Sequence, residues 1–179
     1  MDYMKDLEID DLIDDMGKKK KVNGKRKGNR VELELCKKLT KHFGREFSRS
    51  VGSGNRWSQV SNMPAHAKST LTGDICVPEG FRWVVECKGG YDDDVDFSSV
   101  LDGGCARLDE FIEQSNHDAE QSGRKPIICW KRSRKPWIAL IRTTDNPANF
   151  EYSTHYRDWI IVALDELLKT ENLIWFDQT

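Results

Sequence analysis

Apolar residues recur along the chain with two different periods, and the longer period predicts three helices. The segment 29–44 spaces its apolar residues three and four apart and ends in a glycine, which is the pattern of an amphipathic helix with a stop signal. The segment 105–122 shows roughly the same spacing and also ends at a glycine. A third helix is predicted over 157–170, "RDWIIVALDELLKT". The apolar face of the first helix consists of Val31, Leu35, Leu39 and Phe43.

Shorter runs that are rich in β-branched and aromatic residues predict five strands between these helices. Each run is bounded by glycine, proline or charged turn residues, as strands usually are. The order along the chain is helix, three strands, helix, two strands, helix, which fits an α/β domain with a mixed central β-sheet flanked by helices. The five runs are "EFSRSV", "DICV", "FRWVVECK", "PIICW" and "PWIALI".

Charge and composition divide the chain of 179 residues into two parts. Residues 2–15 are mostly acidic and residues 17–30 are basic, so the net charge of −2 hides a segregation of charge. We expect an N-terminal extension over 1–26 and a single domain over 27–179, with a long polar loop at 55–72. The acidic start is unlike a signal peptide and no apolar run could span a membrane, so we expect a cytoplasmic or nucleoid-associated protein without a membrane partner.

The five cysteines are scattered and contain no CxxC pair. Neither a disulfide framework nor a structural zinc site is therefore indicated, and reduced thiols are expected.

The basic run directly precedes the first predicted helix. Such a run is commonly a solvated tail, but its position also suits an arm that contacts DNA phosphates. The candidate contacts in it are Lys25, Arg26, Lys27 and Arg30.

The stretch "GDICVPEGFRWVVECKGG" places three charged residues where chemistry could occur. Glu86 and Lys88 are two apart on a predicted strand, so their side chains leave the same face. The short connection predicts that the strand beginning at Asp74 is an antiparallel neighbour, which would bring Asp74 close to both. Two converging carboxylates repel one another unless a cation lies between them, and Mg²⁺ suits oxygen ligands. An acid followed by ExK is a weak signal alone, so a charged surface hairpin remains an alternative.

Glu32 shares the apolar face of the first helix with Leu35 and Leu39. A carboxylate aimed at the sheet needs a partner, because burying it alone is costly. The partner could be a metal centre, or Glu32 could pair with an arginine or reach water.

The order "KGNRVELELCKKL", "RSVGSG", "GDI", "WVVECK" and "RLDEFIEQSN" resembles archaeal-type Holliday junction resolvases of the PD-(D/E)XK nuclease superfamily, over residues 27–142. The resemblance implies a restriction-endonuclease-like core, a homodimer, and Mg²⁺-dependent nicking of four-way DNA junctions, with Mn²⁺ as a substitute and no small-molecule cofactor. It also implies that Asp74, Glu86 and the backbone carbonyl of Cys87 bind the metal, that Lys88 is catalytic, and that Glu32 assists, either directly or through water. Arg49 and Ser53 match the family's segment near the scissile strand, and Lys27 matches its basic entry to the first helix, so the resemblance implies DNA contacts at all three.

Two departures from the family pattern concern the motif itself, where Gly73 replaces the proline and Cys87 replaces an aliphatic residue. We expect both to be mild. Further DNA contacts are predicted at Arg56 and Lys68 in the long loop, and at Arg132 and Arg134 in the turn "KRSRK". Two other functions stay open: a repair or restriction-like nuclease acting on linear, flapped or damaged duplex, and a DNA-binding protein without catalysis.

Overall fold

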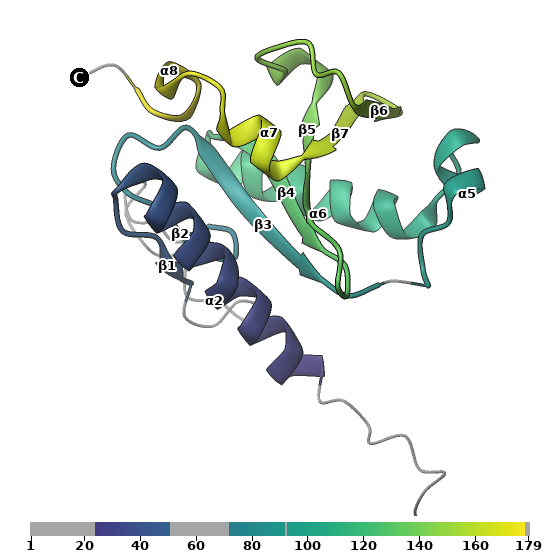
Figure 1. Cartoon of the computed structure of the whole chain (residues 1–179), viewed down its shortest axis with the longest axis horizontal. Helices are drawn as coiled ribbons and strands as arrows, with labels where there is room; N and C mark the ends of the chain where they lie inside the picture. The colour runs from purple at the N-terminus through teal and green to yellow at the C-terminus, as the bar shows by residue number, and fades with distance from the viewer. Residues whose placement is uncertain (1–23, 51–71, 92, 178–179) are drawn as a thin grey trace, which may run out of the picture.

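The computed structural model describes residues 24–50, 72–91 and 93–177 (Figure 1). Most of the predicted N-terminal extension and of the 55–72 loop lies outside the described residues. The predicted DNA contacts Ser53, Arg56 and Lys68 lie outside them as well. None of the described helices has the length and apolar character that a membrane crossing requires.

A mixed sheet forms the centre of the fold, as the sequence predicts, and it has five strands. Three of them match predicted strands. The predicted strands "EFSRSV" and "DICV" form a separate two-stranded sheet instead, and the other two central strands were not predicted. The strand order of the central sheet is β3-β4-β5-β7-β6, with β3 and β4 parallel and the remaining neighbours antiparallel. The parallel pair is possible because a helix connects β3 to β4. The strands are β3 (Trp83–Gly89), β4 (Lys125–Lys131), β5 (Trp137–Arg142), β6 (Ser153–Tyr156) and β7 (Trp159–Ala163).

Helices cover both faces of this sheet (Figure 1). The long helix α2 (Gly24–Phe43) and the short α7 (Leu164–Leu168) pack on one face, and α6 (Ala106–Ser122) packs on the other. Both long helices end immediately before the glycines that the sequence marks as stops. Smaller elements are β1 (Ser48–Arg49), β2 (Ile75–Cys76), α5 (Phe97–Leu101), a 3₁₀ turn (Thr143–Asp145) and α8 (Asn172–Trp175).

The side chains of β3 alternate between two cores. Trp83, Val85 and Cys87 face the α2 side, where they join the larger apolar cluster. Glu86 and Lys88 therefore project toward α6. The five tryptophans of the described residues are buried, as expected for core residues, and all five cysteines are free thiols.

Two predictions about the elements are wrong. The third predicted helix is a strand followed by a single helical turn, because the β-branched run Ile160–Val162 fills a pleated position in the sheet better than a helix. The predicted ladder between β2 and β3 is also absent. Instead, the two residues of β2 pair with β1, and one main-chain hydrogen bond joins the β2 segment to β3.

Candidate active site

The candidate site lies at the C-terminal end of β3, on the face toward α6. Glu86 is 2% exposed, and its Oε1 atom lies 2.6 Å from the Nζ atom of Lys88. The other oxygen, Oε2, is buried and receives no hydrogen bond. A buried oxygen without a hydrogen-bond partner is costly in a protein interior, and Oε2 lacks the partner that Oε1 has in Lys88.

Asp74 reaches the same place from the segment before β2. Its main-chain N–H donates to the carbonyl of Val85 at 3.0 Å, and its Oδ2 atom accepts from the N–H of Cys87 at 2.9 Å. These two bonds hold the carboxylate against β3 beside Glu86. The predicted convergence of Asp74, Glu86 and Lys88 is therefore present, although single hydrogen bonds replace the expected strand ladder.

The backbone conformation of Gly73 allows the neighbouring Asp74 to lie close to β3. Its φ is +84°, and a Cβ atom there would lie 2.9 Å from both the carbonyl oxygen of Val85 and a methyl group of Val84. Proline cannot adopt this φ, so the replacement of the motif's proline is more than a mild variation. The glycine permits a close backbone contact that no other residue allows.

We expect Gly73→Ala to destabilise the protein by about 2–4 kcal/mol, because the positive φ and the contact with the Val85 carbonyl both oppose a side chain. Urea unfolding measures this cost. Gly104→Ala is the matched control, since a Cβ at Gly104 meets open space and its φ is ordinary. Equal stability of the two variants would show that Gly73 does not fix the backbone.

Burial raises the pKa of both carboxyls. For Glu86 the pKa rises well above its ordinary value, first because of burial and then because of the neighbouring charge of Asp74. Burial is also the main cause for Asp74, and the N–H of Cys87 opposes it by stabilising the charged form. The charge of Asp74 makes Glu86 harder to ionise, whereas a side-chain hydrogen bond with Glu86 favours the charged form of Asp74. A bound cation would favour the charged form of Glu86 as well.

The helix α6 supplies three residues to the site that the sequence interpretation did not include. The Nζ atom of Lys88 donates to Oε1 of Gln114 at 2.6 Å and lies 5.0 Å from the centre of the Phe111 ring. Asp118 is 6% exposed and interacts with Glu86. A signal existed: Phe111, Gln114 and Asp118 are spaced by three and four, so they share one helix face.

Burial raises the pKa of Asp118 to about 6, and the negative charge of Asp74 adds to the shift. The folded state therefore holds this proton more tightly than the unfolded chain does. The stability that protonated Asp118 gives the folded state is complete below about pH 4 and is lost as the pH rises through about 6.

In EDTA, we expect the free energy of unfolding of the wild type to fall relative to that of Asp118→Asn between pH 4 and 7, by up to about 3 kcal/mol. Urea titrations at several pH values measure the difference, with the exposed Asp158→Asn as control. A difference that does not vary with pH would contradict the buried acid.

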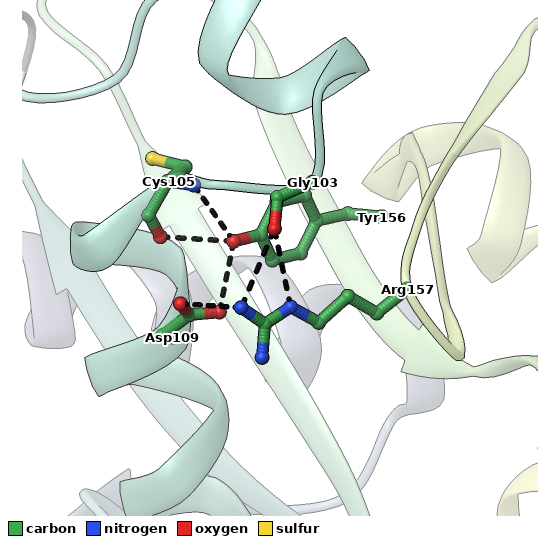
Figure 2. A network of polar contacts seen from close by, with 5 residues as sticks. All are labelled: Gly103, Cys105, Asp109, Tyr156 and Arg157. Atoms are coloured by element: carbon green, nitrogen blue, oxygen red, sulfur yellow. Dashed lines mark hydrogen bonds and ion pairs between the residues drawn. The ribbon is translucent and has the colours of Figure 1, made fainter.

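A polar network fixes the first turn of α6 (Figure 2). The Tyr156 hydroxyl accepts from the N–H of Cys105 at 2.9 Å and lies 2.8 Å from Oδ1 of Asp109. Arg157 donates to Oδ2 of Asp109 at 2.8 Å and to the carbonyl of Gly103. The helix that carries Phe111, Gln114 and Asp118 is thus attached to the β6–β7 turn.

Glu32 forms an ion pair with an arginine, which is one of the alternatives that the sequence left open. Its Oε2 atom lies 2.5 Å from Nε of Arg49, and Arg49 also donates to Asn29 at 2.9 Å. Glu32 projects from α2, on the sheet face opposite to Glu86, but its charge contributes to the raised pKa of Asp74. The structure therefore places Glu32 near Asp74 and in an ion pair.

Several predicted DNA contacts gather at the same end of the sheet. Residues 24–30 begin α2, whose Val31 packs against the position of Gly89, and Arg30 is exposed. The β4–β5 turn follows Lys131, which pairs with Gly89 across the parallel ladder. Arg134 is exposed at this turn, and Arg132 lies over the Trp130 ring. In Figure 1 the start of α2 and the β4–β5 turn lie at the same end of the molecule.

The donor set suits a divalent cation that retains water. Across residues 24–50, 72–91 and 93–177, no three His, Cys, Asp or Glu side chains are arranged to hold a metal ion. Two repelling carboxylates with one oxygen lacking a donor are nevertheless what Mg²⁺ commonly uses in nucleotide-processing sites, where water and substrate complete its shell. Asp74 and Glu86 therefore fit such an ion.

A mixed sheet flanked by helices, with an aspartate beside a Glu-x-Lys pair, defines a PD-(D/E)XK nuclease core. Residues 23–176 match the family described as "Phage putative PDDEXK endonuclease", and the chain belongs to this family of DNA-cleaving proteins, which typically use a divalent metal. The chain is also similar to Protein D14 of Escherichia phage T5, with 27% identity over 129 residues that cover 69% of this chain and 74% of that protein. No solved structure gives a significant match.

Proposed function

We propose that the protein is a Mg²⁺-dependent, structure-selective DNA endonuclease that hydrolyses phosphodiesters at Asp74, Glu86 and Lys88. The observation that supports this most is the buried pair of repelling carboxylates beside an ammonium group, 2.6 Å from Glu86. A surface hairpin with charged ends would leave these groups in water. Here they are withdrawn from water, at a cost that the Lys88 ammonium group offsets in part and that a bound cation would offset further.

In this proposal Asp74, Glu86 and the backbone carbonyl of Cys87 hold Mg²⁺, and Mn²⁺ substitutes for it. Glu32 assists from the α2 side through a water molecule. Such an ion would supply Lewis-acid chemistry at these residues, by activating water for attack and neutralising charge on the phosphate. Lys88 donates hydrogen bonds that orient the attacking water and the scissile phosphate, and Gln114 and Phe111 hold its ammonium group in place.

DNA reaches the site over the basic end of the sheet. The proposed phosphate contacts are Lys25, Arg26, Lys27 and Arg30 at the start of α2, Arg49 beside Glu32, and Arg132 and Arg134 at the β4–β5 turn. Ser53, Arg56 and Lys68, which lie outside the described residues, are proposed contacts as well. Phosphate contacts fix position without reading sequence, so affinity is expected to fall steeply with salt.

We further infer that the substrate is branched DNA and that the enzyme acts as a junction resolvase. The support is the order of motifs shared with archaeal-type resolvases. A two-fold homodimer would present two sites to opposing strands, as paired nicks across a junction require. The setting would be a cytoplasm that holds the DNA, which is the host's if the chain is viral.

The test compares cleavage of an end-labelled immobile four-way junction, a flapped duplex and the linear duplex arms in Mg²⁺. We expect paired nicks near the branch point, with the linear arms cut at least tenfold more slowly. Equal cutting of the junction and the arms would support a nuclease but contradict the proposal that it is a junction resolvase. Light scattering with and without DNA tests the dimer, and a monomer in both conditions would contradict it.

A further inference from the structure

Tyr91 has an unusual backbone and an exposed ring next to the candidate site. It follows Gly90 directly after β3, its φ is +59°, and 38% of it is exposed. A bulky residue in the left-handed region is rare, and such strain persists where the surroundings enforce it, often at functional sites.

Two hydrogen bonds made by the preceding residue, Gly90, fix the main chain that leads into Tyr91. The Trp130 indole N–H donates to the carbonyl of Gly90 at 2.8 Å, and the N–H of Gly90 donates to the carbonyl of Lys131 at 2.9 Å. Both partners belong to β4, so the central sheet determines where the backbone of Tyr91 begins.

The ring of Tyr91 is also held in one orientation. Phe111 meets it edge to face, with ring centres 5.1 Å apart, and the Arg107 guanidinium lies 5.1 Å from its centre. Arg107 is itself paired with Asp94 and Glu110. Because one guanidinium faces two carboxylates, this exposed surface carries a net negative charge, and it offers a ligand the aromatic ring rather than a cation.

This ring lies close to the ammonium group of Lys88. Lys88 Nζ is 5.0 Å from the centre of Phe111, and the Tyr91 ring is 5.1 Å from the same centre. The Nζ atom of Lys88 and the centre of the Tyr91 ring are therefore no farther apart than the sum of these two distances. Since a DNA strand advances about 3.4 Å per nucleotide in a duplex, Tyr91 is within a few nucleotides of the phosphate that Lys88 would contact.

We infer that Tyr91 is a stacking platform for an unpaired nucleobase next to the cleaved phosphodiester; this inference rests on the proposed nuclease function. An oriented, partly exposed aromatic ring binds the flat face of a base at little entropic cost. Bases inside a regular duplex are already stacked on each other and cannot reach it. The platform therefore selects DNA whose bases are unstacked, as they are at a branch, flap or bulge.

The test uses DNA with 2-aminopurine as a single unpaired base, bound to protein in EDTA so that no cleavage occurs. Stacking on Tyr91 is expected to quench the fluorescence, and Tyr91→Phe is expected to retain the quenching. Tyr91→Leu and Tyr91→Gly are expected to lose it and to bind this DNA about tenfold more weakly, with duplex affinity unchanged. Tyr152→Leu, at an exposed tyrosine away from the site, is the matched control.

The glycine variant guards against misfolding, because glycine accepts the positive φ of this position without strain. Unchanged quenching and affinity in both the leucine and glycine variants would overturn the inference, as would absence of quenching by the wild type. Neither result depends on cleavage. A wild type that quenches 2-aminopurine but cuts no DNA would instead contradict the proposed function and leave the platform in place.

Discussion

Glu86→Gln is expected to reduce the rate of DNA cleavage about a thousandfold, which corresponds to about 4 kcal/mol of transition-state stabilisation. Glutamine keeps the size of the side chain but removes the negative charge that would hold the metal. The variant loses its ion pair with Lys88, but the repulsion from Asp74 also disappears, so the fold should be retained.

Single-turnover cleavage of end-labelled DNA measures this effect, and calorimetry with Mn²⁺ should show loss of metal binding in the same variant. Glu79→Gln is the matched control, because Glu79 is an exposed acid in the turn before β3, at the opposite end of that strand from Lys88. Cleavage by Glu86→Gln at the wild-type rate would place the chemistry elsewhere.

Lys88→Met is expected to slow cleavage at least a hundredfold and to leave metal binding intact. Methionine keeps most of the apolar stem against Phe111 but removes the ammonium group that, in the proposed function, would orient water and phosphate. Lys169→Met, at an exposed lysine on the surface, is the control.

The same experiment extends to Gln114, which holds the ammonium group. Gln114→Leu should slow cleavage about tenfold in the wild type and have no further effect in Lys88→Met, since Gln114 acts only through the lysine. Equal effects of Gln114→Leu in both backgrounds would assign Gln114 a role independent of Lys88.

The two long helices and the pair Glu86 and Lys88 could be predicted because local spacing decides them. A period near 3.6 identifies a helix face, and two residues that are two apart on a strand must share a side. The closeness of Asp74 followed from the short connection, although the predicted ladder was wrong, since the two-residue strand β2 pairs with β1 instead.

The parts that the sequence did not reveal depend on tertiary packing. Whether α6 covers the face of the sheet that carries Glu86 cannot be read from its own period, so its spacing alone does not assign Gln114 and Asp118 to the candidate site. The strand β7 was mistaken for helix because its apolar run continues into α7, and only its place between β5 and β6 selects the extended form. The need for glycine at position 73 arises from contact with Val85 across the chain.

The most direct test of the central claim is cleavage of end-labelled branched and linear DNA by the wild type in Mg²⁺, beside EDTA and beside Asp74→Asn. The account predicts cutting only by the wild type with the metal, and restoration when Mn²⁺ replaces Mg²⁺. A folded wild type that binds DNA but cuts no substrate in either metal would contradict it, and so would Asp74→Asn cutting at the wild-type rate.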